Sequence, residues 1–141
     1  MMRKVLVFKE TLPAPSETFI LAQMTALSEY EPVLASLERA RPSLPLRHEP
    51  LLLSDRGPLI SDLRAKLYRR SGIAPAFHSK AKCSHPDLVH AHFASGGRTA
   101  LPLARALKVP LIVTLHGNDV TVRGRQPDRY RRLGEEASLF I

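Results

Sequence analysis

Apolar residues along this chain fall into two kinds of segment, short continuous runs and longer stretches with helical spacing. The short runs are rich in valine, leucine and isoleucine, which predicts buried strands of a parallel sheet. The expected strands are residues 4–8, 33–37, 51–53, 87–93 and 110–115, and a last apolar run covers 137–141. The expected helices follow residue 16 and then cover residues 59–70, 96–107 and 127–136. Strands alternating with helices predict an α/β fold, a Rossmann-like open parallel sheet with helices on both faces.

Polar residues, prolines and glycines mark the ends of these elements. Ser16 is a good N-cap for the first helix, and Gly72 predicts the end of the helix over 59–70. Residues 72–86 are basic and lack a periodic pattern, so we expect a surface loop there. Pro102 lies inside a predicted helix, which should start or bend near it because proline removes a hydrogen bond and clashes with the preceding turn.

Length and composition fit a single globular domain. The chain has 141 residues, of which 44% are hydrophobic and 24% charged, enough for one core and close to the globular average. Its apolar runs are far shorter than the roughly 20 residues of a membrane-spanning helix, and the run after the basic N-terminus is too short for a signal peptide. The single cysteine, Cys83, excludes an internal disulfide. We therefore expect a protein of the cytoplasm.

A net charge of +8 and a pI near 10.3 favour an anionic partner, which could be a phosphorylated ligand, an acidic lipid surface or nucleic acid. No RNP strand pattern, zinc-finger spacing or clear helix-turn-helix is present, so nucleic acid is not the expected partner. A basic nucleic-acid-binding or anion-binding α/β domain without catalysis remains the alternative function. A nicotinamide-dependent oxidoreductase is disfavoured because no GxGxxG motif follows the first strand.

Suggestive residues gather in three loops that follow predicted strands. These loops are residues 15–18 (PSET), 90–97 (HAHFASGG) and 116–119 (HGND). In a parallel sheet the carboxyl ends of the strands share one edge, where such sheets bind ligands. The helix after Ser16 can attract an anion at its N-terminus, and Gly96 and Gly97 permit a close approach at the next one. Serine and glycine also occur at helix ends for structural reasons, and Asp119 could be a general base or a turn cap. The position of all three loops at one edge of the sheet therefore indicates a binding site more strongly than any one of these residues does.

The histidines allow a second interpretation. His90 and His92 alternate along one strand, so both should face the same side of the sheet. A zinc pair completed by His85, His116 or Cys83 is conceivable. No CxxC or HExxH pattern accompanies them, and histidines at this spacing often pack or form hydrogen bonds, so we expect no metal site.

Three strings resemble glycosyltransferase family 4, especially its exopolysaccharide and colanic-acid biosynthesis members. They are SETFI at residues 16–20, PDLVHAHF at 86–93 and PLIVTLHGND at 110–119. The resemblance covers most of the chain and is loose between residues 38 and 84. The pairing of HAHF with a later T-x-HG-x-D string is far more specific than a lone glycine-rich loop. One departure is Ala94, where relatives more often place glycine directly after the phenylalanine, so the local turn should differ.

The resemblance implies a GT-B architecture, with an N-terminal domain that binds the acceptor and a C-terminal domain that grips the nucleotide-sugar. Residues 1–141 match the first domain, so the chain is expected to be truncated, to lack the donor-binding domain and its paired glutamates, and to be inactive alone. The implied enzyme is a hexosyl-type transferase of EC class 2.4 acting on a polysaccharide or lipid-linked acceptor. Family members usually retain the anomeric configuration and need no metal, and the nucleotide-sugar is a substrate, so no cofactor is expected.

The resemblance also implies roles for individual residues. His116 looks like the residue that reaches the donor sugar, and Asp119 is grouped with it as catalytic. Residues expected to bind substrate are Ser16, Glu17, Thr18, His92, Gly96, Gly97, Gly117 and Asn118.

The predicted helix over residues 59–70 has an apolar stripe with basic residues around it. The stripe consists of Leu59, Ile60, Leu63 and Leu67, and the basic residues are Arg64, Lys66, Arg69 and Arg70, with Lys80 and Lys82 after the helix. Packing of the stripe on the sheet is the ordinary explanation. The alternative is peripheral docking on the anionic inner face of the cytoplasmic membrane, where a lipid-linked acceptor would lie.

Overall fold

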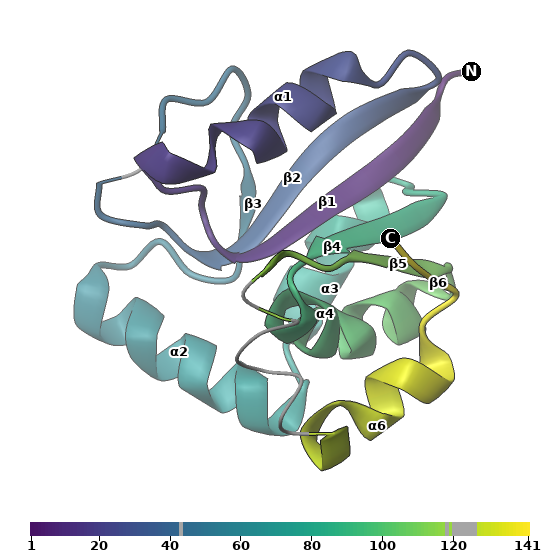
Figure 1. Cartoon of the computed structure of the whole chain (residues 1–141). Helices are drawn as coiled ribbons and strands as arrows, with labels where there is room; N and C mark the ends of the chain where they lie inside the picture. The colour runs from purple at the N-terminus through teal and green to yellow at the C-terminus, as the bar shows by residue number, and fades with distance from the viewer. Residues whose placement is uncertain (43, 118, 120–126) are drawn as a thin grey trace.

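The computed structural model describes residues 1–42, 44–117, 119 and 127–141. Figure 1 shows a parallel sheet with helices on both of its faces. The strands are β1 (Arg3–Thr11), β2 (Tyr30–Glu38), β3 (Leu51–Leu52), β4 (Leu88–His92), β5 (Leu111–Thr114) and β6 (Leu139–Phe140). The helices are η1 (Pro15–Glu17), α1 (Thr18–Ala26), α2 (Pro58–Ser71), α3 (Pro75–Cys83), α4 (Ala94–Leu107) and α6 (Pro127–Glu136).

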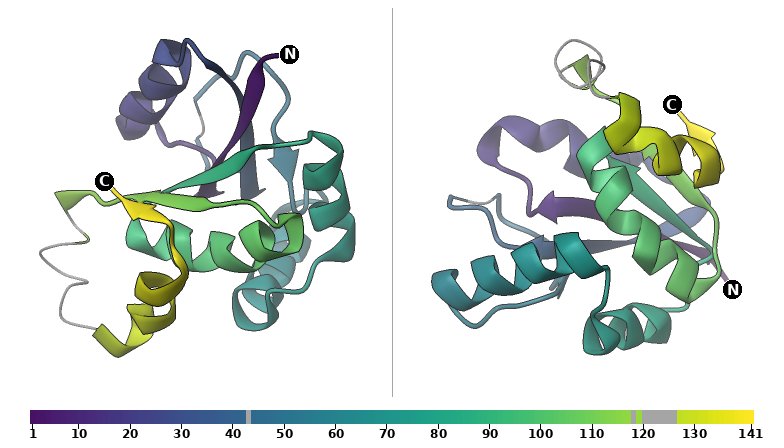
Figure 2. Two further views of the ribbon diagram at one scale, coloured as in Figure 1. Left: turned by 90° about the vertical axis from the view of Figure 1, so that its right-hand side faces the viewer. Right: turned by 90° about the horizontal axis from the view of Figure 1, so that it is seen from below.

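Within the described residues the strands form one sheet in the order β3-β2-β1-β4-β5-β6, and every neighbouring pair is parallel. α1 covers one face over β1 and β2, whereas α2, α3, α4 and α6 lie on the other face (Figures 1 and 2). The predicted Rossmann-like fold is therefore confirmed. The strand order reverses between β1 and β4, because β2 and β3 extend to one side of β1 and the later strands extend to the other.

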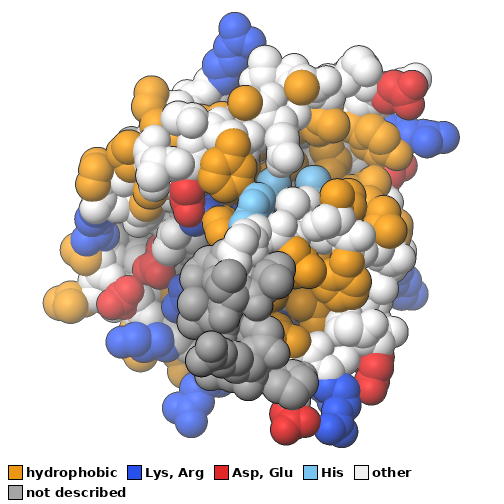
Figure 3. All heavy atoms as spheres, in the orientation of Figure 1, with side chains coloured by type: hydrophobic (Ala, Val, Ile, Leu, Met, Phe, Trp, Pro, Cys, Tyr) orange, Lys and Arg blue, Asp and Glu red, His pale blue; other side chains and the backbone are white. Residues whose placement is uncertain are grey.

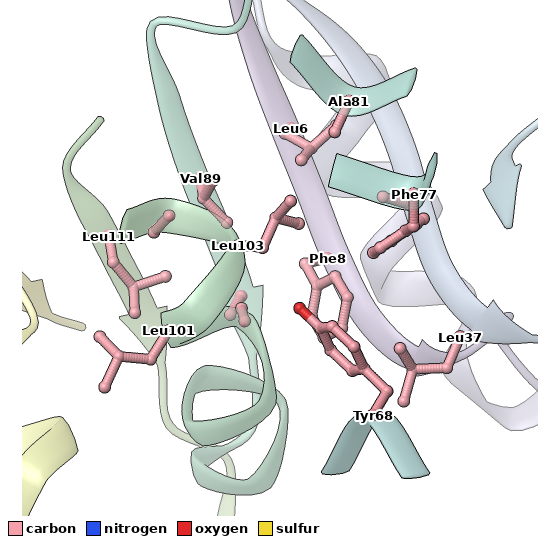
Figure 4. Close-up of a cluster of buried hydrophobic side chains, with 14 of the residues drawn as sticks. Leu6, Phe8, Leu37, Tyr68, Phe77, Ala81, Val89, Leu101, Leu103 and Leu111 are labelled. Carbon is pink, nitrogen blue, oxygen red and sulfur yellow. The ribbon is translucent and has the colours of Figure 1, made fainter. Parts of the chain in front are cut away.

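Side chains of β1 alternate between two apolar layers, as the two-residue period of a strand requires. Leu6 and Phe8 belong to the larger core cluster beneath α2, α3 and α4 (Figure 4). Val5 and Val7 belong to the cluster beneath α1, together with Ile20 of that helix. Burial on both faces explains why the central strands read as continuous apolar runs.

Two local predictions are wrong. The segment 72–86 contains α3 instead of a surface loop, and Phe77 and Ala81 of this helix are buried. Polar and basic residues separate these two, so the short helix has no long periodic pattern. Ser16 does not cap a helix, because Pro15 begins a single 3-10 turn one residue earlier and Glu17 stands at the N-cap position of α1.

α2 ends at Gly72, as predicted, and this glycine has φ of 66°. Gly72 also contacts Pro102. A Cβ atom at Gly72 would lie 2.7 Å from Cγ of Pro102, so the proline ring packs directly on the glycine backbone. The helix containing Pro102 begins well before it, at Ala94, and continues through it to Leu107. Of the two alternatives, a start of the helix at the proline is excluded, and the predicted helix over residues 96–107 is confirmed with two more residues at its beginning.

The orientation of α2 is the largest difference from expectation. Its buried side chains are Ser61, Ala65 and Tyr68. The leucines and isoleucine of its apolar stripe are exposed. The two small residues let the helix approach the core closely, and Tyr68 fills the space between Phe8 and Leu37 (Figure 4). Packing of the stripe on the sheet is therefore excluded.

Candidate functional site

The reversal of strand order places a crevice at the carboxyl ends of β1 and β4, which is where open α/β sheets bind ligands. β1 brings Lys9 and Glu10 to this edge, and β4 brings His92 followed by Phe93. The turn η1 follows β1, and the loop with His116 follows β5. The predicted convergence of three strand-end loops on one edge is therefore confirmed.

Three histidines form a row on the face of the sheet that carries α1. The rings of His90 and His92 lie on the same side of β4, as predicted, with their centroids 4.7 Å apart. Nδ1 of His92 lies 3.3 Å from Nε2 of His116, and the two rings stack with centroids 5.5 Å apart. Nε2 of His90 lies 2.7 Å from the hydroxyl oxygen of Thr114. In Figure 3 histidine side chains reach the surface in the middle of this view.

Two phenylalanine rings enclose His116. The ring centroid of Phe93 lies 4.3 Å from that of His116. The ring centroid of Phe19, on α1, lies 4.9 Å from that of His116. Phe93 has φ of 68°, which is rare for a bulky residue. Its amide donates to the carbonyl of Thr114 at 2.9 Å, and its own carbonyl accepts from Gly97 at the start of α4. The backbone is thus held from both sides in a conformation that costs energy.

The surroundings keep these histidines neutral near pH 7. Burial first, and then the nearby His90, His116 and Lys9, lower the pKa of His92 to about 3. Burial and the neighbouring His116 lower the pKa of His90. Burial also lowers the pKa of His116, although Asp119 and Glu17 oppose the shift. A neutral His116 has one donor and one acceptor nitrogen, so it can both donate and accept a hydrogen bond.

Asp119 acts on the backbone of the His116 loop. Its Oδ2 accepts the amide of His116 at 3.0 Å, and its own amide donates to the His116 carbonyl at 2.8 Å. The side chain is buried, with an exposed fraction of 5%. This geometry matches the interpretation of Asp119 as a turn cap. Through these two hydrogen bonds Asp119 positions the backbone of His116. Gly117 is exposed in the same loop, and Asn118 lies outside the described residues.

Glu17 is held by a buried lysine. Nζ of Lys9 lies 2.8 Å from Oε2 of Glu17, and both side chains are mostly buried. The same oxygen accepts the amide of Ala14 at 2.9 Å. The lysine ammonium also lies 5.7 Å from the centre of the Phe93 ring. Lys9 therefore joins β1, η1 and the start of α4 at the crevice.

The other residues predicted to bind substrate are partly on the surface and partly turned toward the core. Ser16, in η1, and Thr18, the first residue of α1, are exposed. Gly97 faces the interior, because a Cβ atom there would lie 2.8 Å from Cγ2 of Val113 and 3.1 Å from Cδ2 of Leu133. This position favours a packing role for Gly97 over the predicted substrate contact. A Cβ atom at Gly96 would meet nothing within 4 Å.

The sequence did not single out Lys9, Phe19 or Phe93 as site residues. The available signal for Lys9 was a charged residue directly after the apolar run of the first strand. Phe19 lies on α1 with its side chain 38% exposed. Among the described residues, no group of three or more His, Cys, Asp or Glu side chains is arranged to hold a metal ion.

Two cavities lie on different sides of the sheet. A polar one of about 260 Å³ adjoins the carboxyl edge and is lined by Glu10, Arg69, Ser95, Arg98, Thr99 and Arg129. A larger one, about 610 Å³, lies at the amino ends of β1 and β2, where Met2, Met24 and Tyr30 contribute to its wall. The larger cavity is remote from the histidine row, so we assign the candidate site to the carboxyl edge.

Comparison with known proteins gives the class to which this fold and site belong. Residues 20–140 match the family model of Glycosyltransferase Family 4, and the chain belongs to that family. A stretch of 60 residues is 42% identical to a putative teichuronic acid biosynthesis glycosyltransferase, TuaC, of Bacillus subtilis (strain 168). This stretch is 41% of the present chain and 15% of that relative.

A solved structure shares the fold over the whole chain. It is a UDP-N-acetylglucosamine 2-epimerase, with a TM-score of 0.56 and 14% sequence identity. The match covers 100% of this chain and 42% of the epimerase chain. At this identity the likeness concerns the fold, and the present chain spans less than half of the epimerase chain.

Proposed function

We propose that this chain is the acceptor-side domain of a glycosyltransferase that moves a sugar from a nucleotide-sugar to a polysaccharide or lipid-linked acceptor in cell-surface polysaccharide biosynthesis. The observation that carries the proposal is the placement of His116 at the carboxyl edge beside the point where the strand order reverses. Family membership supports the class of reaction. The arrangement of the site residues supports the carboxyl edge of the sheet as the place of that reaction. The reaction would occur on the cytoplasmic side of the membrane.

In this proposal His116 binds a sugar hydroxyl and does not remove a proton from carbon or oxygen. Its Nε2 faces His92, so the substrate meets the other side of the imidazole ring. Phe19 and Phe93 pack against the ring and restrict its orientation. Such a pre-positioned hydrogen bond lowers the barrier when it strengthens in the transition state.

The described carboxylates of Glu10, Glu17 and Asp119 at the carboxyl edge each make a structural contact, and Glu10 pairs with Arg69. Glu17 is paired with Lys9, and Asp119 holds the backbone of His116. This arrangement supports a retaining transfer without a carboxylate nucleophile from this domain. The bond from the anomeric carbon to the donor phosphate breaks, the bond to the acceptor oxygen forms, and a phosphate oxygen takes the proton of the acceptor hydroxyl. A second α/β domain would grip the donor across the crevice.

The test is a transfer assay on the complete enzyme with labelled nucleotide-sugars and extracted glycan or lipid-linked acceptors. We expect label in the acceptor fraction, and we expect His116→Ala to lower turnover on the order of tenfold to a thousandfold. His48→Ala is the matched control, because His48 is exposed in the segment between β2 and β3. Near-normal turnover in a folded His116→Ala enzyme would contradict the role. NMR of the product would report the anomeric configuration.

The alternative function has its own outcome in the same experiment. A basic anion-binding domain without catalysis would transfer no label from any nucleotide-sugar. It would instead bind nucleic acid with an affinity that falls steeply as salt rises. That pair of results would overturn the transferase proposal.

A further inference from the structure

The polar cavity at the carboxyl edge of the sheet brings together charged side chains from four elements. Its volume is about 260 Å³. We call it the arginine pocket, and its lining residues are Glu10, Arg69, Ser95, Arg98, Thr99 and Arg129. They belong to β1, α2, α4 and α6. Figures 1 and 2 show these three helices together on the side of the sheet away from α1, so segments far apart in the sequence build the pocket.

The helices that line the pocket are held firmly to one another. A Cβ atom at Gly97 of α4 would lie 3.1 Å from Cδ2 of Leu133 of α6, so these two helices pack closely. Nε of Arg105, further along α4, donates to Oε2 of Glu136 at 2.6 Å. The backbones that carry the lining residues of α4 and α6 are therefore fixed before any ligand binds.

One face of α4 forms a wall of the pocket. Ser95, Arg98 and Thr99 are spaced three and four residues apart, so they share this face. Thr99 is only 8% exposed, and its hydroxyl oxygen lies 2.5 Å from Oε1 of Glu10. Ser95 lies in the first turn of the helix, so the positive end of the helix dipole is at the pocket. Phe93, at the N-cap position, has no side-chain oxygen to cap this end, where an anion is favoured.

The charge of the pocket favours an anionic ligand. Three arginines and one carboxylate line it. The carboxylate of Glu10 is paired with Arg69, which also pairs with Glu38, each at 3.4 Å. Arg98 is exposed, and within the part of the chain that the structure describes it forms no ion pair. Because a guanidinium group can bind a carboxylate or a phosphate through two parallel hydrogen bonds, Arg98 suits such a ligand.

The arginine pocket and His116 lie on the two sides of one edge of the sheet. The ring of Phe93 lies 4.3 Å from that of His116, and Ser95, only two residues later, lines the pocket. Lys9 and Glu10 are neighbours in β1, so their side chains point to opposite faces, Lys9 toward η1 and Glu10 toward α2. A substrate that crosses this edge can therefore contact both sites.

We propose that the arginine pocket binds an anionic group of the acceptor, a carboxylate or a phosphate carried by a sugar, and that Arg98 forms the main ion pair with it. This inference rests on the proposed function, because it names the class of acceptor. The pocket is smaller than the roughly 300–1,000 Å³ of sites for drug-sized ligands, so it suits one charged sugar unit and not a longer chain. Arg129, on α6, adds positive charge to the same pocket.

The first test is binding of simple sugars to the full chain at constant ionic strength, followed by nitrogen–proton NMR. The probes are glucuronate, glucose 6-phosphate and neutral glucose. We expect saturable shifts of the Arg98 side-chain signal and of the amides at the start of α4 with the two charged sugars and not with glucose. Arg98→Gln should weaken this binding by about tenfold or more, because it removes a hydrogen bond between charged groups. The charged sugar that binds more tightly distinguishes a carboxylate from a phosphate.

Two further variants separate charge from geometry. Arg98→Lys keeps the charge and loses the planar fork of donors, so its affinity should lie between those of the parent protein and Arg98→Gln. Arg64→Gln is the matched control, because Arg64 is exposed on α2 and is absent from the pocket lining. It removes the same charge from the molecule and should bind the charged sugars as the parent protein does.

The second test uses the complete enzyme and connects the pocket to the acceptor. Arg98→Gln should raise the KM for the acceptor by about tenfold and leave the KM for the nucleotide-sugar unchanged. The two tests fail separately. An enzyme that transfers no sugar contradicts the proposed function, whereas binding of the charged sugars to the full chain still decides whether the pocket takes an anion.

Three results would overturn the proposal. One is a full chain that binds neither charged sugar in a saturable way, or that binds glucose equally well. Another is an equal loss of binding in Arg98→Gln and Arg64→Gln, which would indicate an effect of total charge. The third is a change of KM for the nucleotide-sugar in Arg98→Gln with the KM for the acceptor unchanged, because the pocket would then serve the donor.

Discussion

The Lys9 ammonium lies 2.8 Å from Oε2 of Glu17, and this pair ties the carboxyl end of β1 to the turn before α1. Both side chains are mostly buried, and the Lys9 ammonium lies 5.7 Å from the centre of the Phe93 ring. Removing one member of a buried ion pair leaves a charge without its partner, which costs more than removing an exposed pair. The pair therefore stabilises the crevice in a way that a surface ion pair could not.

We expect Lys9→Met to lower the free energy of unfolding by roughly 2 kcal/mol, below the 3–5 kcal/mol of a fully buried pair. Combining it with Glu17→Gln should cost less than the sum of the two single changes, because the pair is then removed as a unit. Urea unfolding of the four proteins measures this coupling. The control is Lys4→Met, since Lys4 pairs with Glu31 at 3.7 Å on the surface of the same strand and should change stability by less than about 1 kcal/mol. Equal losses from both lysines would contradict the buried role of Lys9.

The pKa of His92 predicts how stability changes with pH. In the folded protein this pKa is about 3, below the usual value of 6.5, so the native state disfavours the protonated ring. The contribution to stability is complete above pH 6.5 and is lost as pH falls from 6.5 toward 3. The slope from one such histidine reaches about 1.4 kcal/mol per pH unit. His90 and His116 shift in the same direction and add to it.

We therefore expect His92→Asn to flatten the pH dependence of the free energy of unfolding between pH 7 and pH 5. The difference in slope corresponds to about one proton taken up on unfolding. Urea titrations at three pH values in this window provide the measurement. Parallel curves for the parent protein and the variant would show that His92 is not held neutral by the fold.

Much of the fold could be predicted because its central strands are buried on both faces. Leu6 and Phe8 face one layer while Val5 and Val7 face the other, and this double burial gives a continuous apolar run in the sequence. The edge that carries the candidate site could also be predicted, because the carboxyl ends of parallel strands lie at the same edge of a sheet. α3 escaped prediction because Phe77 and Ala81 are its buried side chains, and two residues make no clear period.

Contacts between distant segments explain the other errors. The leucines of α2 suggested burial by size, but Ser61 and Ala65 face the core because small side chains allow a close approach. Lys9 gave little local sign of its role, since its partner, Glu17, is set by the turn at Pro15. Such pairings depend on the whole fold and not on any one segment.

Gly96 and Gly97 offer a comparison within one helix. A Cβ atom at Gly97 would lie 2.8 Å from Val113, so Gly97→Ala should overpack the core and cost about 1–3 kcal/mol. A Cβ atom at Gly96 would meet nothing within 4 Å, so Gly96→Ala should stabilise the helix by up to about 1 kcal/mol. Thermal and urea unfolding distinguish the two variants. A loss of transfer activity in a stable Gly96→Ala enzyme would support the substrate contact predicted for Gly96, and equal stability of the two variants would contradict the packing role of Gly97.

At position 93 we expect a glycine variant to be more stable than an alanine variant, the opposite of the usual order of stability. At φ of 68° any side chain strains the backbone, by roughly 1–3 kcal/mol, and a hydrogen bond to the Thr114 carbonyl and one from the Gly97 amide hold it there. Phe93→Ala keeps this strain and loses the ring contacts, whereas Phe93→Gly loses the same contacts and relieves the strain. We therefore expect the glycine variant to be more stable than the alanine variant by about 1 kcal/mol in urea unfolding, although glycine is ordinarily the less stable of the two. Both should lower transfer activity, because the ring that packs 4.3 Å from His116 is gone. A more stable alanine variant would show that the turn at Phe93 is relaxed, and the enclosure of His116 would then need another explanation.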